Sequence, residues 1–262
     1  MKERIKAFFI KLKNYVLNNK KRTAVILVSA VSVTVCAIIL TSIFIPKKNN
    51  FDGYRNLNVK EIVQDGIVIS GNPVDFPKLK KENPDICAWI RIDGTAIDYP
   101  VLRSDTLEEE DFYLNHDYKK KNASHGAVYM QKINDETFIS NNTVLYGHDM
   151  LDGSMFADVK KYRNQGFLEK NRQIKIYTPK RILTYKIFSA YRTDDSNILD
   201  TYNFYDEASF NRFIKDCKKS NICDKSVSPK FGDKLITLST CTGSKSERFV
   251  AVGVLLSSVL TK

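Results

Sequence analysis

A cysteine and an arginine near the C-terminal end have the types and spacing of a nucleophile and its electrostatic partner. Cys241 lies in residues 237–248 (TLSTCTGSKSER), where it ends a β-prone run and enters a small polar turn. If residues 235–241 and 249–255 are adjacent antiparallel strands, Cys241 and Arg248 emerge at one end of a sheet, about 4.8 Å apart. A guanidinium there favours a thiolate, or an oxyanion formed from its substrate. The alternative is a buried filler cysteine beside an arginine that binds loop carbonyls.

A cysteine nucleophile also needs a group that accepts and donates protons, and the sequence offers only three histidines. His116 and His125 lie in polar segments. His148 follows the β-prone run 143–146 past one glycine, so it stands at a strand end, as Cys241 does. This placement favours His148 as the acid–base residue over the alternative of a surface or strand-end histidine. Spacing alone does not establish that His148 and Cys241 meet.

The elements that must position these residues are mostly short strands. Turn residues separate the strands, a series typical of a barrel or a sandwich, so we expect a mainly β domain with helices (α+β). A helix is predicted over 206–219 from an apolar face at helical spacing, and shorter helical patterns cover 59–68 and 76–83. The eight strands are predicted at residues 87–92, 96–102, 127–130, 143–146, 173–178, 182–191, 234–240 and 249–256.

Charge is distributed unevenly along the chain. The net charge is +11, but residues 1–48 hold ten Lys/Arg and one Glu, which leaves only +2 for residues 49–262. Basic and acidic residues are interspersed in that larger part, so it offers no basic groove for nucleic acid. No Cys-x-x-Cys pair or glycine-rich loop indicates zinc or phosphate binding, and we expect neither a metal nor a cofactor.

An apolar run explains the basic excess. Residues 24–45 form an uncharged, mostly apolar stretch of 22 residues, long enough as a helix to cross a hydrocarbon core of roughly 30 Å. The positive-inside rule places a cytoplasmic basic segment at 1–23, a transmembrane signal anchor at 24–45, a tether at 46–58 and an extracellular domain at 59–262. The alternative is a cleaved signal peptide, whose apolar region is normally only about 7–15 residues.

Several motifs together resemble the sortase family. Tyr146-Gly147-His148, then TLSTC ending at Cys241, then Arg248, follow the sortase order of histidine, TLxTC cysteine and downstream arginine. Other segments resemble class B sortases: the hairpin WIRIDGT and IDYPV within 89–101, FYLN, NTVLYGH, DGSMF, and a helix before the last two strands. The resemblance covers roughly residues 55–258.

The resemblance implies a closed eight-stranded sortase-type β-barrel with N-terminal helices, preceded by the transmembrane helix. It implies a thiol transpeptidase that cleaves a sorting-motif peptide of secreted proteins and forms a thioester at Cys241. An amine from peptidoglycan or its lipid-linked precursor resolves that thioester, with His148 as acid and base and Arg248 as the oxyanion and backbone clamp. Implied groove contacts are Ser239, Thr240, Asn115 and Tyr146, although for Tyr146 core packing is an equal alternative.

Some features stay open at the level of sequence. Certain class B enzymes carry an acid shortly after the cysteine, but this chain has Thr242-Gly243-Ser244 there, and Asp149 is expected to point away from His148. A Cys217–Cys223 disulfide is an open possibility. Other functional readings are a pilin-polymerising sortase, a cysteine hydrolase without transfer, and a non-catalytic anchored β domain; no lid segment is evident between residues 49 and 83.

Overall fold

A computed structural model of the chain describes residues 19, 28–29, 31–37, 51–55, 61–64, 67–241 and 246–261. The chain divides into two compact units, Met1–Pro46 and Lys47–Lys262. In the first unit the structure describes helix at 28–29 and 31–37; the rest of the predicted span 24–45 and nearly all of segment 1–23 lie outside the described residues. No helix within the described ranges has both the length and the apolar character needed to cross a membrane.

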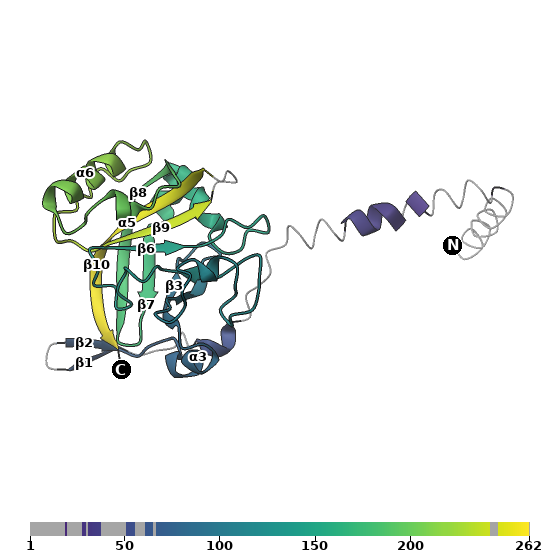
Figure 1. Cartoon of the computed structure of the whole chain (residues 1–262), viewed down its shortest axis with the longest axis horizontal. Helices are drawn as coiled ribbons and strands as arrows, with labels where there is room; N and C mark the ends of the chain where they lie inside the picture. The colour runs from purple at the N-terminus through teal and green to yellow at the C-terminus, as the bar shows by residue number, and fades with distance from the viewer. Residues whose placement is uncertain are drawn as a thin grey trace, which may run out of the picture. The chain divides into compact units, whose positions relative to one another are not determined.

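The second unit is built around a closed β-barrel (Figure 1). Its sheet runs β10-β8-β7-β3-β4-β5-β6-β9, and a further pairing of β9 with β10 closes the ring. The pairs β4/β5 and β6/β9 are parallel, and the other pairs in the ring are antiparallel. All eight predicted strands are confirmed: β3 (Ile86–Arg91), β4 (Asp98–Leu102), β5 (Val128–Tyr129), β6 (Asn142–Tyr146), β7 (Gln173–Tyr177), β8 (Arg181–Asp194), β9 (Leu235–Cys241) and β10 (Glu247–Thr261).

The alternation of side chains along β10 explains why the barrel has two cores. Phe249 and Ala251 point into the barrel, where they join the core built around Trp89. Val250 and Val252 point outward and join a second core. Successive side chains of a strand face opposite sides of the sheet, so an apolar strand such as β10 needs cover on both faces.

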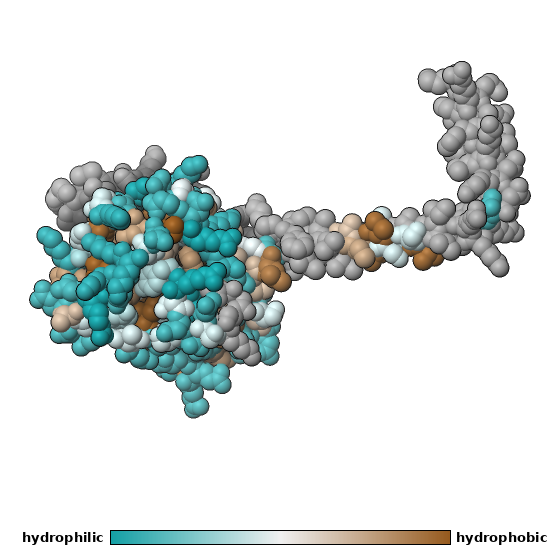
Figure 2. All heavy atoms as spheres, turned by 90° about the horizontal axis from the view of Figure 1, so that it is seen from above, coloured by the Kyte–Doolittle hydropathy of each residue, from teal (hydrophilic) through white to brown (hydrophobic). Residues whose placement is uncertain are grey.

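Helix α6 (Glu207–Lys218) supplies that outer cover, as predicted for 206–219. Asp206 caps its N-terminus by accepting a hydrogen bond of 2.7 Å from the Ser209 amide. The buried face is the one expected from sequence: Phe210, Phe213, Ile214 and Cys217. The short helix α5 (Ile198–Thr201) also lies between β8 and α6 in the chain. On the face seen in Figure 2 the compact unit is mostly hydrophilic.

The N-terminal part of this unit differs from the prediction. Helix α3 (Phe76–Glu82) is confirmed, with Asp75 accepting from the Lys78 amide at its start. The helix predicted over 59–68 is wrong, because β1 (Glu61–Gln64) and β2 (Ile67–Ser70) form an antiparallel hairpin instead. The β-branched residues of EIVQ and IVIS favour strands, and the intervening Asp-Gly is a strong hairpin signal. β2 then pairs in parallel with the end of β10.

Short helical turns complete the unit: η1 (Asp52–Tyr54), η2 (Phe112–Leu114), η3 (Ala157–Arg163) and α4 (Gln165–Lys170). In η1, part of the stretch assigned to the tether, the chain already packs on the domain: the preceding Phe51 meets the Trp89 ring edge-on, with 5.2 Å between centroids. No helix is predicted over 157–170, since these segments are too short to show a helical period. They matter for the site because η2 and the loop before η3 lie next to the histidine.

Candidate active site

Cys241 and Arg248 face each other across two paired strands. Cys241 is the last residue of β9, and Arg248 stands directly opposite it in the antiparallel register with β10. Opposed residues of antiparallel strands have Cβ atoms about 4.5–5.5 Å apart. The expected placement of the guanidinium beside the thiol at one end of the sheet is therefore confirmed.

Exposure distinguishes Cys241 from the other cysteines of this unit. Cys87, Cys217 and Cys223 are buried, and burial raises the pKa of the first two thiols to about 12. All three are free thiols, so Cys217 and Cys223 are not bonded to each other. Cys241 is half-buried and lines a cavity of about 320 Å³. Partial exposure next to a cation is the setting in which a cysteine can act as a nucleophile.

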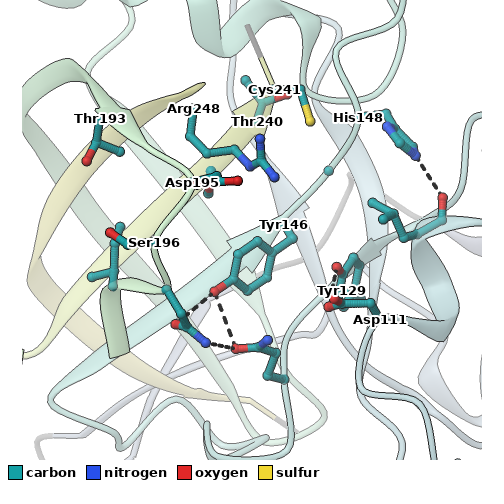
Figure 3. A pocket seen from close by; sticks show the side chains of 16 residues that line it. Asp111, Tyr129, Tyr146, His148, Thr193, Asp195, Ser196, Thr240, Cys241 and Arg248 are labelled. Carbon is teal, nitrogen blue, oxygen red and sulfur yellow. Dashed lines mark hydrogen bonds between the residues drawn. The ribbon is translucent and has the colours of Figure 1, made fainter. Parts of the chain in front are cut away.

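His148 reaches the same cavity because β6 runs parallel to β9. Tyr146 pairs with Ser239, and the Gly147 amide donates a hydrogen bond of 3.2 Å to the Ser239 carbonyl. Each chain then advances two residues from that pair, to His148 on one side and to Cys241 on the other. Both side chains therefore leave the sheet at the same level, and Figure 3 shows Cys241 between Arg248 and His148.

A main-chain carbonyl orients the imidazole. His148 Nε2 lies 2.7 Å from the carbonyl oxygen of Leu114, at the end of η2. A carbonyl only accepts hydrogen bonds, so Nε2 carries the hydrogen, and in the neutral ring Nδ1 is the basic nitrogen. Asp149 forms an ion pair with Lys160 and is no orienter of the ring, as expected. Leu114 thus takes the orienting role that a carboxylate fills in other catalytic sites.

The backbone of Gly126 passes close to the Leu114 carbonyl. Gly126 has φ +57°, and a Cβ added to it would lie 2.5 Å from the Leu114 oxygen. Next to Gly126, the Ala127 amide donates a hydrogen bond of 2.8 Å to the Tyr113 carbonyl. Glycine alone combines this left-handed conformation with such an approach. The sequence contains this signal as Ser124-His125-Gly126, but its partner η2 is not evident from spacing.

Three of the four expected groove residues line the cavity. Ser239 and Tyr146 lie on the wall, and Thr240 lines it with a buried hydroxyl that has no hydrogen-bond partner in the described part of the chain. Asn115 is not among the lining residues. It follows Leu114 directly, and its carbonyl accepts from the Ala123 amide, so its role as a groove contact stays a prediction.

Other lining residues escape sequence reasoning. Thr193 stands opposite Arg248 in the pairing of β8 with β10, so the loop that follows β8 lies near Arg248. The polar run Asp194-Asp195-Ser196-Asn197 after a long apolar strand is the available signal, but only the long-range pairing places it here. The lining residues not predicted are Asp111, Leu114, Tyr129, Gln131, Gly147, Thr193, Asp195, Ser196, Asn197 and Ile198.

Two stacked tyrosines form a polar wall of the cavity. The rings of Tyr129 and Tyr146 have centroids 5.4 Å apart, and the Tyr129 hydroxyl donates to Asp111 over 2.8 Å. Burial, followed by the charge of Asp111, raises the pKa of both hydroxyls far above the usual range. Both tyrosines therefore stay neutral near pH 7 and contribute hydrogen bonds to the cavity wall. Within the described ranges no cluster of three or more His, Cys, Asp or Glu side chains could hold a metal ion.

A thiol, an imidazole and a guanidinium at one end of a closed barrel define the site of a cysteine acyl-transfer enzyme. The Sortase domain family matches residues 90–256 of the chain. Sortase B of Listeria monocytogenes serovar 1/2a is 34% identical over 167 residues, covering 64% of this chain and 67% of that protein. Sortase B of Staphylococcus aureus is 31% identical over 172 residues, with coverages of 66% and 69%.

Solved structures agree with this assignment. A Staphylococcus aureus sortase B–substrate complex superposes with a TM-score of 0.63 at 30% identity, covering 70% of this chain and 85% of that one. The chain belongs to the sortase family, and its resemblance to class B is confirmed. It is a cysteine transpeptidase.

Proposed function

We propose that this enzyme cleaves a sorting-motif peptide in secreted proteins and transfers the acyl group to an amine of peptidoglycan or its lipid-linked precursor. The observation that carries the proposal is the pairing of Arg248 directly opposite Cys241, with His148 level with the thiol in one cavity. The similarity to a sortase B solved with its substrate supports a peptide as the first substrate. Residues from β5, β6, β8, β9 and β10 line this cavity.

In the first half-reaction the thiol proton of Cys241 passes to His148 Nδ1, Sγ attacks the scissile carbonyl carbon, and the carbonyl oxygen becomes an oxyanion. Arg248 stabilises this charge, since a guanidinium already in place needs no reorganisation as the charge develops. The C–N bond then breaks, and His148 donates a proton from Nδ1 to the leaving amine. The products are a thioester at Cys241 and the released C-terminal fragment.

In the second half-reaction the acceptor amine attacks the thioester carbonyl. His148 Nδ1 takes the proton from the attacking nitrogen, the C–S bond breaks, and a new amide leaves the enzyme with Cys241 regenerated. A thioester keeps the acyl group activated, so a well-placed amine can capture it before water does. The Leu114 carbonyl holds the Nε2 side of the ring through both steps, and this allows Nδ1 to serve as acid and then as base.

We also propose that residues 24–45 anchor the enzyme in the membrane, with the N-terminus cytoplasmic and the barrel outside. The length of the apolar run and the basic residues before it support this. Substrate and acceptor would then both meet the enzyme at the membrane surface. No described residue between 49 and 83 lines the cavity, which favours cell-wall attachment over the lid-bearing pilin-polymerising enzymes.

The test uses the full chain in detergent with a peptide library and a diamine, and reads the products by mass spectrometry. Peptides that carry the motif are expected to yield a new amide with the diamine, and Cys241→Ala is expected to yield none. Acid products alone, at every diamine concentration, identify a hydrolase instead. If no peptide is cleaved and Cys241 shows no selective reaction with a thiol reagent, the domain is a non-catalytic anchored module.

A further inference from the structure

We propose that Tyr99 is a positioning residue for the transpeptidation, because it fixes His148 through the loop that follows the histidine. The inference rests on the acid–base role proposed above for His148. The His148 loop is defined here as residues 148–156. It leaves the barrel at the imidazole, turns through Asp152-Gly153 and returns to the backbone of the histidine itself.

The closure of the loop is a set of short-range backbone contacts around His148. The Phe156 amide donates a hydrogen bond of 2.8 Å to the His148 carbonyl. Asp149 and Met155 form an isolated antiparallel bridge inside that closure. The Phe156 ring covers Gly147 so closely that a Cβ there would lie 2.7 Å from the ring. A shift of Met155 or Phe156 is therefore transmitted directly to the backbone of His148.

Tyr99 reaches this loop from a different part of the barrel. It lies on β4 with 3% of its surface exposed, and its hydroxyl oxygen accepts a hydrogen bond of 2.7 Å from the Met155 amide. Met155 has φ +56°, a left-handed conformation that non-glycine residues rarely adopt. Such a conformation persists only where the surroundings hold it, and the Tyr99 hydroxyl is placed at that residue.

Packing fixes only part of the His148 loop, since Met155 and Phe156 belong to the barrel core while other loop residues face a cavity. Met150, Asp152, Ser154 and Met155 border a cavity of about 440 Å³, and Tyr99 forms part of the same wall. Atoms that face a cavity lose the contacts that fix a close-packed interior. Hydrogen bonds add restraint beside this cavity, and the one from the Met155 amide to the Tyr99 hydroxyl links the loop to β4.

Tyr99→Phe keeps the ring and removes the hydroxyl group that accepts from the Met155 amide. The Met155 amide then loses its partner in a buried position, and the loop is expected to relax toward an ordinary φ. The imidazole moves with it, away from the geometry that transfers protons at Cys241. Misplacement of a catalytic group by a fraction of an ångström lowers kcat by roughly tenfold or more. KM for the peptide is expected to change little, because Tyr99 does not line the cavity that holds Cys241.

The experiment measures kcat, KM, and the ¹H–¹⁵N signal of the His148 ring Nε2–H in the full chain in detergent. For Tyr99→Phe we expect the tenfold loss in kcat and a shifted, faster-exchanging ring signal. Tyr202→Phe is the matched control: its hydroxyl donates to Asp216 over 3.0 Å on the α6 side, so neither quantity should change. Adding Met155→Gly to Tyr99→Phe should restore part of kcat, since glycine adopts positive φ freely.

An unchanged kcat and an unchanged ring signal in Tyr99→Phe overturn the inference. Equal losses in Tyr99→Phe and in the double variant also contradict it, because they indicate general destabilisation. Unfolding midpoints of all variants identify that case. His148→Ala separates this inference from the proposed function. If this variant keeps full transpeptidation, the acid–base assignment of His148 fails. The ring signal of Tyr99→Phe, compared with that of the wild-type enzyme, still reports whether Tyr99 positions the histidine.

Discussion

The substitution Gly126→Ala tests whether the Leu114 carbonyl orients His148. The new methyl group would lie 2.5 Å from the Leu114 oxygen, whereas an ordinary contact begins at 3.4 Å. The carbonyl must therefore move by roughly 0.9 Å unless Gly126 itself moves. Movement of the carbonyl away from His148 by that amount would lengthen the hydrogen bond from Nε2, now 2.7 Å, toward 3.6 Å, a length at which it is no longer a hydrogen bond.

Two magnitudes follow from this geometry. Alanine at φ +57° costs about 1–2 kcal/mol of stability through its backbone conformation alone, and the clash adds to that. A displacement of about 1 Å at a catalytic group can lower turnover by about 10². We therefore expect Gly126→Ala to lower both the free energy of unfolding and kcat.

Gly232→Ala is the matched control. Gly232 also has positive φ, +98°, but a Cβ there meets no atom within 4 Å. This variant should show a loss of stability from its backbone conformation while kcat per folded molecule stays at the wild-type value. Urea midpoints and steady-state transpeptidation of both variants make the comparison. If Gly126→Ala is as active per folded molecule as Gly232→Ala, Leu114 does not orient the histidine in the way described.

Three further predictions concern the guanidinium, the thiols and a surface carboxylate. Arg248→Ala should lower kcat by about 10²–10³ without changing the unfolding midpoint, because it removes one oxyanion partner; circular dichroism and steady-state kinetics check both quantities. In the folded enzyme iodoacetamide should label Cys241 well before Cys87, whose pKa is raised to about 12 by burial; peptide mapping by mass spectrometry reads the order. Hydrogen bonds from Ser226 and Lys186 lower the pKa of Asp224 to about 2. Since this lies below the unfolded value of about 3.9, its stabilising contribution is complete above about pH 4 and is lost as the pH falls toward 2. Asp224→Asn should flatten that part of the Tm–pH curve, and an unchanged curve would count against the assignment.

Much of the barrel can be predicted because its strands carry strong local signals. The eight β-prone runs and the apolar face of α6 can be recognised in the sequence, because their apolar residues pack into the core inside the barrel or the core outside it. The hairpin at 61–70 shows the limit of this reasoning. Its apolar residues fit a short helical pattern as well as a strand, and the pairing of β2 with the end of β10 decides between them.

The residues of the site also differ in how well the sequence predicts them. Cys241 and Arg248 are separated by a short connection, so local chain geometry is enough to place them together. The meeting of His148 with Cys241 depends on the parallel pairing of β6 with β9, which no spacing reveals, although the strand-end placement and the family resemblance both favour this histidine. The loop after β8 is harder to predict, because only a long-range strand pairing places it at the cavity. The role of the Leu114 carbonyl is harder again, because a main-chain group has no residue type that marks it.

Capture of the acyl-enzyme tests the central claim most directly. The full chain is mixed with an intact peptide that the library assay has identified as a substrate. The reaction is quenched in acid within one turnover, and the digested enzyme is examined by mass spectrometry. We predict a single acyl adduct on Cys241 that disappears when a diamine is added before the quench, with the matching amide formed in equal amount. Amide formation without an adduct on Cys241, or by the Cys241→Ala variant, would contradict the account.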